Sequence, residues 1–109
     1  CPDPSCNPYL AFAVMLRAGL DGIKRRLEVP AISNQDLYHL SNESRREQGL
    51  RTLPGSLGEA LEELAQDALV RETLGDHIFE RFMEAKSMEW QQYGLQVSQW
   101  ELERYLRVY

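Results

Sequence analysis

The most apolar stretch of the sequence, Tyr9–Leu16, lies in a predicted helix that runs from Pro8 to about Glu28. Asn7 is a favourable N-cap residue, and proline suits the first helical position because its missing N–H costs nothing there. The helix must stop before Pro30, which disfavours helical backbone in the preceding residue. One apolar stripe recurs at steps of three and four residues: Tyr9, Phe12, Leu16, Leu20, Ile23 and Leu27. We expect the first half, apolar on all sides, to be buried all round, and the second half to be amphipathic.

Two glycines interrupt this helix at a spacing of three residues. Gly19 and Gly22 each cost about 1 kcal/mol relative to alanine in a helix interior. They share one face, which favours the close approach of another backbone; the alternative is a relaxed composition near the helix end. Asp21 and Arg25 form an i,i+4 pair in the favourable order.

Short helices are predicted after a loop that covers residues 31–40. Ser41 or Asn42 can cap a polar helix from Glu43 to Gln48, and Gly49 would end it. Further on, Ser56 and Glu59 have the spacing of a capping box. The helix that they start carries four apolar residues on one face: Leu57, Ala60, Leu61 and Leu64.

A second long helix is predicted close behind. Asp67 can cap a short helix that Gly75 ends, and Asp76 can cap the long one, which runs to about Tyr93. Its apolar face consists of Ile78, Phe79, Phe82, Met83, Trp90 and Tyr93. Its charged residues are interpreted as a solvated surface and not as a metal site: Glu80, Arg81, Glu84, Lys86 and Glu89.

A terminal helix begins with a second capping box, formed by Ser98 and Glu101. Its apolar residues recur at helical spacing: Leu102, Tyr105, Leu106 and Tyr109. A helix this short is marginal alone in water and needs packing. The residues alone leave two readings open, namely that it folds back on its own domain or that it docks into a neighbour.

These elements predict an all-α architecture of two long helices with several short ones, since strand patterns and internal repeats are lacking. The 109 residues suit one domain or a piece of one. Because the sequence begins at Cys1 without a methionine, we expect it to be an excerpt of a longer protein. We expect no nucleic-acid partner, because the net charge is −5 and the pI is about 5.0. The longest apolar run is too short to cross a membrane, and no signal peptide is visible.

The sequence shows no catalytic constellation. Residues 54–58 lack the lysine of a phosphate-binding loop, and the serines have no plausible His and Asp partners. His39 and His77 are interpreted as surface or capping residues. For Cys1 and Cys6 we favour reduced, inert thiols over a disulfide or a metal site.

Several motifs follow one another in a fixed order over nearly the whole chain: Pro2–Ala13, Ala18–Ile23, Leu53–Leu61, Leu74–Ile78, Glu84–Trp90, Gln96–Glu101, Arg104–Leu106 and Tyr109. In this order they resemble the C-terminal helical region of bacterial type I glutamine synthetase. The resemblance implies that residues 1–109 are the C-terminal helical segment of that enzyme's α+β catalytic domain.

The resemblance further implies a cytoplasmic parent enzyme that makes glutamine from glutamate and ammonia. In that family ATP phosphorylates the γ-carboxylate of glutamate, and Mg²⁺ or Mn²⁺ neutralises the transferring phosphoryl group. The metal ligands and the substrate-binding arginine of the family lie upstream of Cys1. The segment itself therefore matches no catalytic, cofactor-binding or metal-binding residue, and it is predicted to be inactive alone.

The family also implies partners and regulation. Its subunits form a homododecamer of two stacked hexameric rings, and the C-terminal segment reaches into a pocket of the opposing ring. The resemblance therefore implies that the corresponding residues of this chain contact another subunit. This oligomer-docking set consists of Trp100, Leu102, Tyr105, Leu106 and Tyr109. Some members are adenylylated on a loop tyrosine that aligns with Tyr38, but they carry Asp-Leu-Pro-Pro where this chain has residues 39–42, His-Leu-Ser-Asn.

Residues 41–53 are closer to the Gram-positive type, which is feedback-inhibited by glutamine and is not adenylylated. In some of those bacteria the C-terminal region also binds nitrogen-response repressors. A packed loop residue is the alternative reading of Tyr38. The alternative for the whole chain is a free-standing helical interaction or regulatory module without catalysis.

Overall fold

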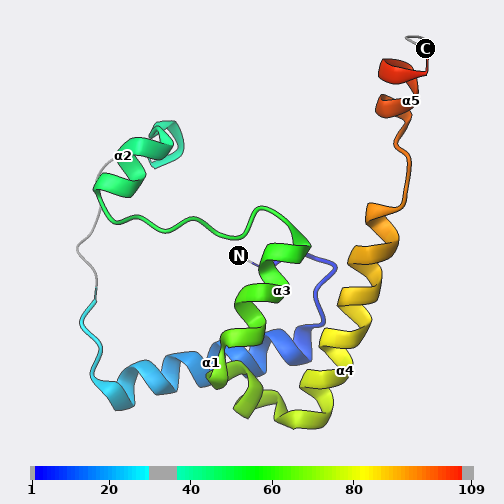
Figure 1. Ribbon diagram of the computed structural model, residues 1–109. Coiled ribbons are helices and arrows are strands. Elements are labelled where there is room, and N and C mark those ends of the chain that lie inside the picture. The colour runs from blue at the N-terminus through cyan, green and yellow to red at the C-terminus, as the bar shows by residue number, and fades with distance from the viewer. Residues whose placement is uncertain (1, 30–36, 107–109) are drawn as a thin grey trace. The chain divides into compact units, whose positions relative to one another are not determined.

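The computed structural model describes residues 2–29 and 37–106, and over these residues the chain is helical and contains no strand. The prediction of an all-α chain is confirmed. The chain divides into two compact units, Cys1–Gly55 and Ser56–Tyr109. The first holds α1, η1 and α2, and the second holds α3, α4 and α5 (Figure 1).

The helix α1 spans Pro8–Arg25 and begins as predicted. The side-chain oxygen of Asn7 accepts hydrogen bonds from the backbone N–H groups of Tyr9 and Leu10, at 3.0 and 3.3 Å. The helix ends earlier than the predicted Glu28, because Arg26 adopts a left-handed conformation with φ of 52°. In that conformation the N–H groups of Arg26 and Leu27 bond back to the carbonyls of Ile23 and Gly22, which closes the helix.

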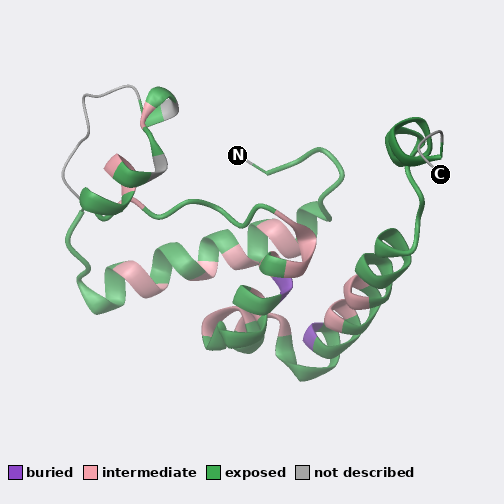
Figure 2. Ribbon diagram, turned by 45° about the horizontal axis from the view of Figure 1, so that its top comes forward, coloured by how far each residue is buried: buried purple, intermediate pink, exposed green. Residues whose placement is uncertain are grey.

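The burial predicted for α1 is wrong. Among the residues that the structure describes, none in this helix is buried, and Tyr9 and Phe12 are 85% and 67% exposed. Figure 2 shows α1 as exposed and intermediate positions only. The predicted close approach to Gly19 and Gly22 is not found either, since the nearest described atom to a Cβ built at Gly22 is Leu27 Cδ1, at 4.0 Å. An apolar stripe identifies the face of a helix that gains stability from burial. Whether that face is buried depends on residues outside the helix, which the stripe does not reveal.

The rest of the first unit is a short helical pair, with η1 at Leu37–His39 and α2 at Asn42–Glu47. Ser41 is the N-cap, and its hydroxyl accepts from the N–H of Ser44 at 3.2 Å. Gly49 follows the helix with φ of 65°, a conformation that favours glycine. The Nη2 of Arg45 donates to the carbonyl of Leu37 at 3.1 Å and ties the two elements together.

The second unit is built on a helical hairpin. The helix α3 spans Leu57–Gln66, and α4 spans Ala68–Gly94 with one non-helical residue inside it, Gly75. The two helices pack against each other, and the later part of α4 runs beside α3 (Figure 1). As predicted, the hydroxyl of Ser56 accepts from the N–H of Glu59, and the carboxylate of Asp67 accepts from the N–H of Val70.

The short and the long helix predicted on either side of Gly75 are the two arms of α4, residues 68–74 and 76–94. Gly75 has φ of 73° and ψ of 155°, so the helix bends at this residue and no separate loop joins the two arms. The N-cap role predicted for Asp76 is wrong, because its carboxylate accepts from the Nε–H of Arg71 instead.

The core of the hairpin lies near this bend. Leu61 of α3 and Phe79 of α4 are the buried hydrophobic residues of the described chain, at 8% and 4% exposure. The predicted face of α3 is confirmed, since its other three members are half-buried. The predicted face of α4 holds only in part, because Tyr93 near its end is 70% exposed.

Trp90 and Gly58 close the other end of the hairpin. A Cβ built on Gly58 would lie 2.7 Å from Nε1 and 2.8 Å from Cε2 of the Trp90 indole. The indole also stacks on the ring of Tyr93, with centroids 5.9 Å apart. Only glycine leaves room for this ring, so a close approach is found at Gly58, where it involves a side chain and not the backbone that the sequence suggested for Gly19 and Gly22.

We therefore predict that Gly58→Ala destabilises the hairpin by about 1–3 kcal/mol, because the added methyl group displaces a bulky, stacked ring. Urea unfolding followed by tryptophan fluorescence measures the change. Gly94→Ala is the control, since Gly94 is likewise a helical glycine of the hairpin but no described atom lies within 4 Å of a Cβ there. Equal free energies of unfolding for the two variants would contradict the packing described here.

Candidate functional site

The candidate site is the C-terminal docking surface, which we define as the segment 97–106 and which includes α5, Gln99–Tyr105. Its helix begins with the predicted capping box. Ser98 Oγ accepts from the N–H of Glu101 at 3.2 Å, while the Glu101 carboxylate accepts from the backbone N–H and the hydroxyl of Ser98 at 2.7 and 2.8 Å. These bonds satisfy the first turn from within the segment.

The capping box also sets the charge at the start of α5. Hydrogen bonds from the backbone and then the side chain of Ser98 lower the pKa of the Glu101 carboxyl below its usual value. The carboxylate therefore stays ionised at neutral pH, next to the positive end of the helix dipole. The start of α5 is therefore fixed by bonds between Ser98 and Glu101, which both belong to this segment.

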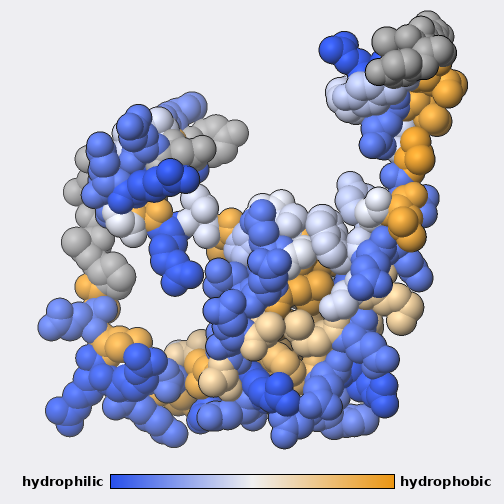
Figure 3. All heavy atoms as spheres, viewed as in Figure 1, coloured by the Kyte–Doolittle hydropathy of each residue, from blue (hydrophilic) through white to orange (hydrophobic). Residues whose placement is uncertain are grey.

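Apolar and aromatic side chains remain exposed around α5. Trp100 and Tyr105 meet edge to face, with ring centroids 5.9 Å apart and planes at 84°. Both rings are still more than half exposed, at 64% and 54%, and Leu106 is 73% exposed. In Figure 3, hydrophobic residues extend from the end of α4 into this segment. Leu95, which follows α4, and Val97, at the start of the segment, are both exposed.

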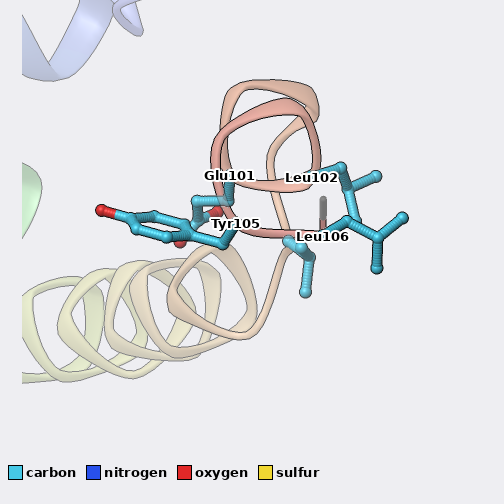
Figure 4. Close-up of a pocket in the computed structure, with 5 residues that line it drawn as sticks. Glu101, Leu102, Tyr105 and Leu106 are labelled. Atoms are coloured by element: carbon cyan, nitrogen blue, oxygen red, sulfur yellow. The ribbon is translucent and has the colours of Figure 1, made fainter. Parts of the chain in front are cut away.

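One side of α5 carries a shallow apolar hollow of about 350 Å³. Figure 4 shows four of its lining residues, Glu101, Leu102, Tyr105 and Leu106, around the ribbon of α5 and its C-cap. The lining residues are Val97, Glu101, Leu102, Tyr105 and Leu106. Four of the five members of the predicted docking set, Trp100, Leu102, Tyr105 and Leu106, thus lie on one short element with exposed surface. Tyr109 lies outside the described residues.

The other candidate residues do not join this surface. Tyr38 falls in η1, and its side chain lies outside what the structure describes, so its suggested modification remains a prediction. Cys6 is exposed with a free thiol, and Cys1 lies outside the described residues.

Residues 2–29 and 37–106 contain no group of three or more His, Cys, Asp and Glu side chains placed to hold a metal ion. Asp76 and Glu80, which follow the bend on the same arm of α4, both bind the Arg71 guanidinium. These two carboxylates are therefore already paired with a cation of the chain. Over the same residues, no helix has the length and the apolar character needed to cross a membrane.

Arg71 is a charged residue whose role the sequence patterns did not reveal. It bonds residues five and nine positions further along the chain, and such spacings belong to no helical i,i+3 or i,i+4 rule. The hydrogen bond to Asp76 is the main reason that the pKa of Arg71 is raised above its ordinary value. Only the bend at Gly75 brings these residues together.

Comparison with known proteins places the chain. The sequence model of the glutamine synthetase catalytic domain matches residues 1–105. A glutamine synthetase of Methanosarcina mazei is 51% identical over 97% of this chain, and one of Thermus thermophilus is 52% identical over 99%. A glutamine synthetase of Staphylococcus aureus is 43% identical over 98% of the chain.

In each of these three comparisons, the matched part is 24% of the relative. The chain thus spans about a quarter of the length of the curated relatives it matches. The match to the domain covers nearly the whole chain, and the resemblance seen in its ordered motifs is confirmed. The chain belongs to the glutamine synthetase family, in the catalytic-domain part of it.

Proposed function

We propose that the chain is the C-terminal helical part of a glutamine synthetase subunit, which braces the catalytic domain and takes part in subunit assembly. The parent enzyme would make glutamine from glutamate and ammonia, with ATP hydrolysis and γ-glutamyl phosphate as the intermediate. The observation that carries this proposal is the match to the catalytic domain over residues 1–105. The relatives at about 50% identity are named glutamine synthetases, which supports it.

The exposed stripe of α1 supports the bracing role. Its members include Phe12, Leu16 and Ile23, which are 67%, 68% and 75% exposed. A helix with such a face gains stability when apolar protein surface covers it, at about 25 cal/mol per Å² removed from water. The remaining three quarters of a subunit would supply that surface, and would also carry the residues for ATP and for Mg²⁺ or Mn²⁺.

The C-terminal docking surface supports the assembly role. Trp and Tyr are the residues that contribute most often to the centre of protein interfaces, and Trp100 and Tyr105 are exposed here on a preformed helix. We assign this surface to contact with another subunit in a homododecamer of two hexameric rings. Binding of nitrogen-response repressors to the same region is a secondary part of the proposal and follows from the family alone. Adenylylation of Tyr38 is the less favoured alternative to a packed loop residue, because residues 41–53 are closer to the type that is not adenylylated. The enzyme would work in the cytoplasm.

We predict that the full-length protein forms glutamine from glutamate, ammonia and ATP, whereas the 109-residue chain alone forms none. The reason is that the chain matches none of the family's principal catalytic ligands. A coupled assay for phosphate release together with glutamine detection tests both proteins. Activity in the isolated chain, or no activity in a correctly assembled full-length protein, would refute the assignment. The latter result would favour a free-standing interaction module.

We also predict that deleting residues 105–109 from the full-length protein weakens the stacking of the rings, because this removes exposed apolar anchors of the docking surface. The particle mass measured by light scattering after size exclusion should fall at a protein concentration where the wild type stays assembled. Arg104→Ala is the control, since it changes an exposed charged residue of the same helix and keeps the apolar side chains. An unchanged particle mass in the deletion variant would show that α5 does not hold the rings together.

A further inference from the structure

The helix α4 bends at one residue, Gly75. Gly75 adopts φ of 73° and ψ of 155°, a region of backbone space that is essentially restricted to glycine. No described atom lies within 4 Å of a Cβ built at this position. The requirement for glycine therefore comes from the backbone conformation and not from crowding.

One side chain spans the bend. Arg71, on the arm 68–74, donates from Nε to Asp76 Oδ1 at 2.7 Å and from Nη2 to Glu80 Oε1 at 3.0 Å, both on the arm 76–94. Its guanidinium carbon also lies 5.0 Å from the centre of the Phe79 ring, within the range of a cation–π contact. A single cation thus contacts three residues on the far side of the glycine.

The bend controls the hairpin. The arm 76–94 leads away from Gly75 to Trp90, which packs on Gly58 at the other end of the hairpin. Because α3 connects to the first arm through Asp67 alone, a change of angle at Gly75 moves Trp90 relative to Gly58. The packing of Phe79 near the bend and of Trp90 far from it depends on the same angle.

We propose that Arg71 is an ionic latch that holds the hairpin closed across a hinge at Gly75, and that salt weakens this latch. In the open state Gly75 takes helical backbone angles, which glycine can adopt as well, and α4 becomes a continuous helix. Such a two-state element is a common basis of conformational switching. The pairs are accessible to ions, since the side chains of Arg71, Asp76 and Glu80 are 45%, 77% and 66% exposed. The inference rests on these contacts and not on the proposed enzyme activity.

Hydrogen exchange measured by mass spectrometry on the full-length protein tests the latch. In Arg71→Ala we expect the peptide that covers Leu57–Gln66 to exchange about three- to ten-fold faster than in the wild type, since two partly exposed ion pairs and one ring contact are lost. Raising the NaCl concentration to about 1 M should accelerate exchange in the wild type and leave Arg71→Ala almost unchanged. Arg71→Lys, which keeps the charge but not the forked geometry, should fall between the two.

Arg81→Ala is the matched control, because Arg81 bonds Glu84 within one arm, at 2.7 Å, and does not span the bend. It should leave the exchange of Leu57–Gln66 near the wild-type value. Equal exchange in Arg71→Ala and Arg81→Ala, or the same salt response in the wild type and in Arg71→Ala, would overturn the proposal.

A backbone variant tests the hinge independently of the charges. Gly75→Ala adds a methyl group that meets nothing, so its effect reports only the cost of the backbone conformation. We expect it to accelerate exchange in Leu57–Gln66 as Arg71→Ala does, whereas Gly94→Ala should not. Unchanged exchange in Gly75→Ala would contradict the proposal that the closed hairpin depends on the backbone conformation of Gly75.

Discussion

Leu61 and Phe79 are the buried hydrophobic residues of the described chain, and they come from the two helices of the hairpin that pack against each other. This packing decides the arrangement of the second unit. It requires α4 to turn back at Gly75, and it requires a glycine at position 58 so that Trp90 can approach. Burial of apolar surface provides the stabilisation, while glycine and Arg71 set the geometry in which that burial is reached.

The first unit shows the opposite balance. The helix α1 is well capped and carries a long apolar stripe, yet it has no buried residue among those described. Ordering such a helix costs conformational entropy that exposed side chains do not repay. The chain belongs to the glutamine synthetase family and matches about a quarter of each relative. The surface that covers this stripe would therefore belong to the rest of the subunit. The docking surface on α5 has the same character, with a second subunit as its proposed partner.

The sequence predicted the helix N-caps, which depend only on neighbouring residues. Asn7, Ser41, Ser56, Asp67 and Ser98 all cap helices as expected, because each bond joins residues two or three positions apart. The helix α5 and its apolar residues were likewise predicted by spacing, whereas their docking role was implied by the family resemblance and stays a proposal. Three features depend on distant residues and were missed, namely the exposure of α1, the contact of Gly58 with Trp90, and the bridge from Arg71 to Glu80. The early end of α1 was missed for a different reason, since a non-glycine residue, Arg26, takes the left-handed position.

The central claim is that α1 is a brace completed only by protein outside this chain. Its most direct test compares amide hydrogen exchange across Pro8–Arg25 in the isolated chain and in the full-length protein. The claim predicts exchange close to that of an unfolded peptide in the isolated chain, because a helix of this length with an uncovered face is marginal in water. It predicts strong protection of the same amides in the full-length protein. Equal protection in both proteins would contradict the claim, since α1 would then be stable without a covering surface.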